Sequence, residues 1–110
     1  MKPTQGYKPT TYSVKFALIE GYTRNNGSFF ISRDFYLDND KVRYTDGWRI
    51  TEKLSGGIIR KTDKRQLAYK IASALEKFDW AGVEREGMLP VGNFLQKARR
   101  VVLEVEKENL

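Results

Sequence analysis

The chain has 110 residues, of which 40% are hydrophobic and 13% aromatic, and its 20 Lys and Arg outnumber its 14 Asp and Glu, giving a formal net charge of +6. This composition predicts one globular domain with a core of its own and excludes a disordered chain. No apolar run approaches the roughly 20 residues that span a bilayer, and the first residues lack the apolar stretch of a secretory signal. We therefore expect a cytoplasmic protein without membrane contact.

Cysteine and histidine are both missing from the chain. The missing cysteine excludes disulfides, a thiol nucleophile and cysteine-based metal sites. The missing histidine removes the commonest general base and the commonest transition-metal ligand. The glycine-rich phosphate-binding motifs and the serine-hydrolase motif do not occur either. We therefore expect a protein that is not an enzyme and that holds no metal and no other cofactor.

Residues 1–11 are predicted to form a flexible basic arm, because they hold two Pro, one Gly and two Lys without hydrophobic periodicity. Residues 12–110 are predicted to form a single domain. Within it, Asn26-Gly27 and Asn39-Asp40 suit two-residue hairpin turns, since such turns need positive φ at both central positions. These turns divide residues 12–52 into the three strands of an antiparallel meander.

Each turn implies a register, and both registers place apolar residues on one face of the sheet, which a slip of one residue would destroy. The first turn pairs Phe16 with Leu37, Leu18 with Phe35 and Tyr22 with Ile31. The second turn pairs Leu37 with Val42, Phe35 with Tyr44 and Ile31 with Trp48. The agreement of two independent turns favours the meander.

The run Ser55-Gly56-Gly57 ends the meander, and Ile58-Ile59 forms either a short fourth strand or a crossing segment. Asp63 and Gln66 then have the spacing of a capping box. Apolar residues follow at helical intervals, which predicts a helix over residues 64–80.

Residues 83–92, rich in Gly and Pro, are predicted to be a loop. The segment after it has a cap and an apolar period typical of a helix, but the β-branched run within residues 100–107 also permits a strand; we favour the helix. The fold class is α+β, a three-stranded, possibly four-stranded, antiparallel meander packed by one or two C-terminal helices. The predicted core consists of Leu18, Phe35, Tyr44, Trp48, Leu67, Ile71 and Leu75.

A row of charges is predicted inside the apolar face, because the two registers place Glu20 opposite Arg33 and Arg33 opposite Asp46. One interpretation is a structural ladder in which the guanidinium donates to both carboxylates. The other is a polar site at the mouth of a cleft, which would require a carboxyl with a shifted pKa to do acid–base chemistry.

The opposite face is predicted to carry aromatic rings beside cations. Such a face can stack on bases while its cations meet phosphates. Two other interpretations stay open: a solvated face on which arginines cover aromatic surface, or a face buried by a helix. Cations at the start of the first helix also suit an anion. The candidate nucleic-acid-binding residues are Lys15, Phe30, Tyr36, Lys41, Arg43, Arg49, Arg60, Lys61, Lys64 and Arg65.

The meander followed by a helix, over about residues 12–80, resembles in topology the small arm-binding domains of phage-type integrases, which lay their sheet in the DNA major groove. Charge is also uneven: residues 1–61 carry 11 Lys and Arg against six Asp and Glu, and residues 62–110 carry nine against eight. The sequence thus favours a small, non-catalytic protein that binds DNA or RNA through a basic sheet face. The alternative is a protein-interaction module that docks through a sheet edge or the C-terminal helix.

Overall fold

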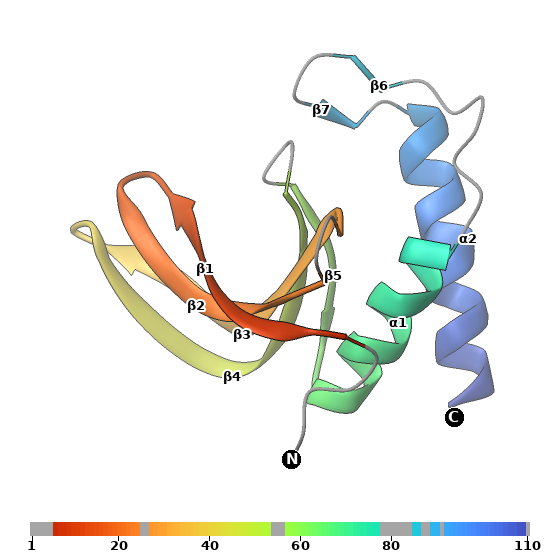
Figure 1. Cartoon of the computed structure of the whole chain (residues 1–110), viewed down its shortest axis with the longest axis horizontal. Helices are drawn as coiled ribbons and strands as arrows, with labels where there is room; N and C mark the ends of the chain where they lie inside the picture. The colour runs from red at the N-terminus through yellow and green to blue at the C-terminus, as the bar shows by residue number, and fades with distance from the viewer. Residues whose placement is uncertain are drawn as a thin grey trace.

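Five antiparallel strands in sequential order form the main sheet of the computed structural model, and two helices pack on one side of it (Figure 1). The strands are β1 (Lys8–Val14), β2 (Ala17–Thr23), β3 (Phe29–Asp38), β4 (Lys41–Glu52) and β5 (Ile58–Thr62). The helices are α1 (Arg65–Lys77) and α2 (Gly92–Glu108), and two short strands, β6 (Arg85–Glu86) and β7 (Leu89–Pro90), pair with each other. The structure describes residues 6–24, 27–53, 57–77, 85–86, 89–90 and 92–109.

The expected α+β class is confirmed, but the main sheet has five strands instead of three or four. One of the two strands beyond the predicted three is β5, which confirms the possible fourth strand at Ile58 and Ile59. The other is β1, so the prediction of a flexible arm is wrong for residues 8–11; residues 1–5 lie outside the described part. Strand β1 pairs with β2 from Lys8–Thr23 to Val14–Ala17 across a two-residue turn. The side chains of residues 8–11 are all exposed, so it is the backbone pairing with β2 that holds this segment in the sheet.

The pairing of β2 with β3 is short. The expected partners Tyr22 and Ile31 are confirmed, within a run of three pairs that ends at Gly21 and Ser32. The expected pairs of Leu18 with Phe35 and of Phe16 with Leu37 are wrong, because β2 and β3 separate beyond that point, while β2 stays paired with β1 along its whole length. Of the two expected turn residues, Asn26 and Gly27, the first lies outside the described part of the chain.

The pairing of β3 with β4 changes register at a bulge. On the turn side of the bulge the expected pairs Phe35–Tyr44 and Leu37–Val42 are confirmed. On the other side Ile31 pairs with Ile50 instead of the expected Trp48. The segment 45–47 has no partner in this register and includes Gly47, whose φ of +96° suits a residue without a Cβ.

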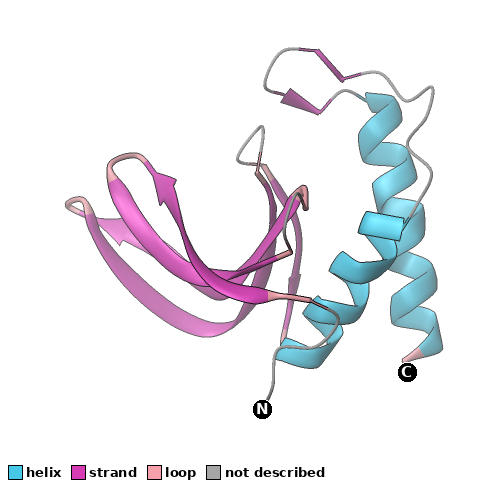
Figure 2. Cartoon of the chain, in the orientation of Figure 1, coloured by secondary structure: helices cyan, strands magenta, loops and turns pink. Residues whose placement is uncertain are grey.

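Helix α1 lies over the sheet and α2 lies beside α1, so the helices form one layer and the curved sheet the other (Figure 2). The expected first helix is confirmed, although residues 78–80 lie outside the described part. The last segment is a helix, as favoured, and it begins at Gly92 inside the expected loop. The main core lies between the layers, where members of both helices meet β3 and β4. Its fully buried members include Phe29, Ile31, Ile50, Ile71 and Leu75.

A second, smaller core lies away from the helices. It contains Ala17, Ile19, Phe30 and Phe35, with flanking residues from β1, β3 and β4, and it holds the β1–β2 hairpin against the outer part of β3 and β4. Of the seven expected core residues, Phe35, Ile71 and Leu75 are buried, and Trp48 and Leu67 are partly buried. The expectation is wrong for Leu18 and Tyr44, which are 66% and 39% exposed. The separation of β2 from β3 leaves both outside the packed region.

Candidate functional site

The expected interface residues do not all face solvent. Phe30 is only 1% exposed and belongs to the second core, so its ring cannot stack on a ligand. Tyr36, by contrast, is 56% exposed, and Lys15, Lys41 and Lys64 are exposed as expected. The expected opposition of Tyr36 and Arg43 is confirmed, whereas Phe30 lies opposite Thr51 instead of Arg49.

Three of the four expected arginines pair with carboxylates of the same chain. Arg43 lies 3.6 Å from the carboxylate of Asp38, in a pair that is about half exposed on both sides. Arg60 donates two hydrogen bonds, of 2.6 and 2.9 Å, to the carboxylate of Glu106 and so ties β5 to α2. The half-exposed pair of Arg43 contributes little to stability and leaves its cation able to exchange partners, whereas the two hydrogen bonds of Arg60 hold its guanidinium in place.

Arg49 is the third, and its contacts stabilise the β3–β4 bulge. Its guanidinium lies 4.0 Å from the centre of the Phe35 ring and donates to the Asp34 carboxylate (2.9 Å) and the Phe35 carbonyl (2.7 Å). Lys61 lies 3.4 Å from the same carboxylate. Burial pushes the pKa of Asp34 upward, but the hydrogen bond from Arg49 and the charges of Arg49 and Lys61 outweigh it, so this pKa lies below its ordinary value.

The expected charge row is wrong. Arg33 lies opposite Trp48, Glu20 lies opposite Thr11, and Asp46 falls in the bulge. No ion pair joins Glu20, Arg33 and Asp46 in the part of the chain that the structure describes. The row has two causes of failure: the register change at the bulge moves Asp46 away from the position opposite Arg33, and the pairing of β2 with β3 ends at Gly21, before Glu20.

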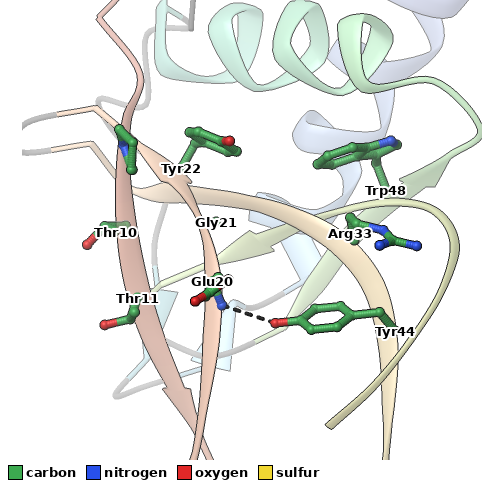
Figure 3. Close-up of a pocket in the computed structure, with 9 residues that line it drawn as sticks. Thr10, Thr11, Glu20, Gly21, Tyr22, Arg33, Tyr44 and Trp48 are labelled. Carbon is green, nitrogen blue, oxygen red and sulfur yellow. Dashed lines mark hydrogen bonds between the residues drawn. The ribbon is translucent and has the colours of Figure 1, made fainter.

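An open groove of about 750 Å³ lies on the sheet, and we call it the aromatic groove. It is lined by Pro9–Thr11 from β1, Glu20–Tyr22 from β2, Arg33 from β3 and Tyr44 and Trp48 from β4. Figure 3 shows Tyr22 and Trp48 at the end nearest α1, and Glu20 and Tyr44 at the other end with Arg33 beside them. The groove therefore combines three aromatic rings with a guanidinium and a carboxylate.

The groove exists because β2 and β3 separate beyond Gly21. The backbone N–H of Glu20 donates to the Tyr44 hydroxyl at 3.2 Å, so a side chain from β4 takes the place of a neighbouring strand (Figure 3). Gly21 stands where the strands part: a Cβ there would collide with the Ile31 carbonyl and the Phe30 ring. The close approach of β2 to β3 at this point thus requires glycine.

Arginines lie against the groove's aromatic rings. The Arg65 guanidinium, at the start of α1, lies 4.5 Å from the centre of the Tyr22 ring and 5.4 Å from that of Trp48. It also donates to the Tyr69 hydroxyl at 2.8 Å. The Arg33 guanidinium lies 5.7 Å from the centre of the Tyr44 ring. These cation–π contacts hold the rings in place and bring positive charge to both ends of the groove.

Burial raises the pKa of the Tyr69 hydroxyl above its ordinary value, and the hydrogen bond and charge of Arg65 reduce that rise without cancelling it. The hydroxyl is therefore neutral at physiological pH and stays available as an acceptor for Arg65. The Arg65 guanidinium is thus held at the junction of α1 and the sheet by the Tyr69 hydroxyl and by the rings of Tyr22 and Trp48.

Sequence reasoning missed the groove's aromatic residues as a site. It placed Tyr44 and Trp48 in the core, whereas both line the groove and keep surface in contact with solvent. A signal was present: Tyr22, Arg33 and Trp48 share one face in the expected registers, and an arginine among aromatic rings on a sheet suits a binding surface as well as a core. The missing information was that the strands separate.

Among the described residues no group of three or more acidic side chains is placed to hold a metal ion. The helices in that part of the chain include none with the length and apolar character needed to cross a membrane. Comparison of the chain with protein-family models, with curated proteins and with solved structures finds no match.

Proposed function

We propose that the protein binds single-stranded nucleic acid in the aromatic groove, without catalysis. The observation that carries this proposal is the arrangement of Tyr22, Trp48 and Tyr44 around one groove, with Arg33 and Arg65 against their rings. Aromatic rings and guanidinium planes stack on bases, and guanidinium groups bind phosphates. This arrangement moves the proposed interface away from Phe30 and Arg49, which are committed to packing and to the bulge.

A single strand fits the groove better than a duplex. The rings line a concave groove with a volume of about 750 Å³, which is large enough to take individual bases. In a duplex each base face is covered by its neighbours, so these rings would have nothing to stack on. Unpaired bases expose both faces, and stacking on an aromatic side chain contributes about 1–3 kcal/mol per base.

The charges near the groove favour a polyanion. Arg33 and Arg65 contribute two positive charges, against one negative charge from Glu20 in the lining. Lys64 is exposed next to Arg65 at the start of α1. Phosphate contacts of this kind release counterions, so the affinity should fall steeply with salt. The Glu20 carboxylate is placed to accept hydrogen bonds from base amino groups in the groove.

The experiment is fluorescence anisotropy with matched single-stranded and duplex oligonucleotides at low and physiological salt. Arg33→Glu should weaken single-strand binding at least about tenfold, because it reverses a charge in the groove. Arg99→Glu, the same change on the exposed surface of α2, is the matched control and should change affinity by less than about threefold. Thermal melts should show both variants as stable as the wild-type chain.

Three results would contradict the proposal: undetectable binding of the single strand at low salt, stronger binding of the duplex, or equal losses in the two variants. Equal losses would indicate a general charge effect with no role for the groove. For the absence of catalysis, the measurement is nuclease turnover of the same oligonucleotides with and without divalent metal, with Glu20→Gln as comparison. Cleavage that disappears in Glu20→Gln would show an active carboxylate.

A second candidate function is protein docking on α2. Leu103 is 53% exposed on this helix, in a hollow of about 320 Å³ that is also lined by basic side chains including Arg100 and Lys107. An exposed apolar residue with a charged rim is typical of interaction sites. Size-exclusion chromatography with light scattering tests it, because an oligomer that persists in high salt and is lost in Leu103→Asp would favour docking.

A further inference from the structure

We infer that the tip of the β1–β2 hairpin is a second contact for the nucleic-acid strand, with the Phe16 ring stacked on a base; the inference rests on the proposed function. Phe16 and Lys15 form the two-residue turn between the paired residues Val14 and Ala17. Both have positive φ, +46° for Lys15 and +69° for Phe16. A bulky residue in this conformation is strained, because its Cβ crowds the following carbonyl oxygen.

Among the described residues, no packing contact of the Phe16 ring offsets this strain. The Phe16 side chain is 102% exposed, so its ring packs against no other part of the described molecule. The β3–β4 hairpin shows the ordinary solution, since Asn39 and Asp40 occupy the same two positions of its turn, with φ of +49° and +66°. Asn and Asp tolerate this region, whereas Phe does not. A strained residue without structural compensation indicates a functional role.

The hairpin presents Phe16 from a fixed base. Behind the tip, Ala17 and Ile19 are buried in the second core, with Tyr12 and Val14 packed against them. The backbone that carries the ring is therefore held at a defined position relative to the sheet. Its neighbour Lys15 is exposed and supplies a cation at the same place, which complements a phosphate next to the stacked base.

Strand β2 connects the tip with the aromatic groove. Alternate residues of a strand share a face, so Leu18 points to the same side as Glu20 and Tyr22, which line the groove. Leu18 is 66% exposed and continues that surface toward Phe16. Phe16 lies six positions before Tyr22, which corresponds to a path of about 20 Å along an extended strand. A strand that stacks in the groove reaches the tip with about six stacked nucleotides.

The test uses the full chain and a labelled single strand of about twelve nucleotides, which covers the whole path. Phe16→Asn removes the ring and supplies a residue that tolerates positive φ. We expect the Tm to rise by about 4 °C or more while Kd rises about tenfold. Phe16→Tyr keeps a ring and should keep wild-type affinity. Leu103→Asn is the control and should leave Kd unchanged, because it changes an exposed apolar side chain of α2, a helix that lies across the molecule from the tip of the β1–β2 hairpin (Figure 1).

Lys15→Ala supplies an independent measurement, because the loss of one phosphate contact lowers the slope of log affinity against log salt by about one. A wild-type chain that binds no oligonucleotide contradicts the proposed function itself. A wild-type chain that binds, with Phe16→Asn and Lys15→Ala binding equally well, contradicts only the role of the tip. A higher Tm together with a lower affinity in Phe16→Asn supports it.

Discussion

The part of the sheet beneath α1 and the part that carries the aromatic groove use similar side chains in different ways. Beneath α1, apolar residues such as Phe29 and Ile31 are packed against the helix and exposed by at most 1%. In the groove, the rings of Trp48 and Tyr44 lie against guanidinium groups and keep surface in solvent. In the covered part the helix shields the apolar side chains from water. In the open part stacked arginines shield the aromatic rings in part, and they leave the rings accessible to a ligand.

The largest effect is expected in the covered part. Leu75 of α1 is fully buried in the main core, so Leu75→Ala should lower the free energy of unfolding by about 3 kcal/mol through lost burial and a cavity. Urea denaturation measures the change. Leu103→Ala on the exposed side of α2 is the matched control and should cost less than about 0.5 kcal/mol. Similar losses in the two variants would show that the covered part is not tightly packed.

A smaller effect is expected at the bulge beside the groove. Asp34→Ala removes the carboxylate that holds Arg49 and should cost about 2 kcal/mol at pH 7. The folded-state pKa of Asp34 is lowered, so its contribution is fully present above the unfolded pKa of about 4 and is lost as pH falls through the folded pKa. The measurement is urea denaturation of the wild-type chain and of Asp34→Ala between about pH 7 and about pH 2. The difference in their free energy of unfolding should shrink toward acid pH.

Asp38→Ala is the control for this prediction, since the pair of Asp38 with Arg43 is about half exposed. It should cost less than about 0.5 kcal/mol at any pH. A deficit in Asp34→Ala that stayed constant down to acid pH would mean that charge on Asp34 does not matter, and that the hydrogen-bond geometry alone stabilises the bulge.

The smallest expected effect is a rise in the free energy of unfolding, at a residue in the covered part. Tyr7 is 2% exposed, and its hydroxyl has no hydrogen-bond partner among the described residues. Burial raises the pKa of this hydroxyl far above its ordinary value. Tyr7→Phe should therefore raise the free energy of unfolding by about 1 kcal/mol, because it removes an unpaired buried polar group. Thermal melts measure the shift, and Tyr36→Phe, at an exposed hydroxyl, should produce none.

Much of the fold could be predicted where local signals agree with the tertiary structure. The turn at Asn39 and Asp40 was predicted because these residues favour positive φ, and the pairs next to it are confirmed. The turn at Lys15 and Phe16 was missed for the converse reason, since neither residue suits its conformation. Without that turn, residues 8–11 could not be recognised as part of a strand. The bulge at 45–47 shifted the remaining register by two residues.

The site was harder to predict than the fold, because the groove depends on the place where two strands separate. Hydrophobic patterning identifies which side chains share a face, and it correctly grouped Tyr22 with Ile31. It carries no information on where pairing ends, so Tyr44 and Trp48 were assigned to a core. The collision that a Cβ at Gly21 would cause, and the hydrogen bond from Glu20 to Tyr44, are tertiary facts visible only in the folded chain.

The separation of β2 from β3 also has a consequence for local unfolding. Three described residue pairs join β2 to β3, whereas seven join β1 to β2. With the second core as its main other attachment, the β1–β2 hairpin should detach locally more readily than β3, β4 and α1, so its amide protons should exchange with solvent sooner than those of Ile31 and Ile50. A ligand bound in the groove contacts both the hairpin and β4 and so suppresses that detachment. Slower amide exchange in β1 and β2 would therefore report that the groove is occupied.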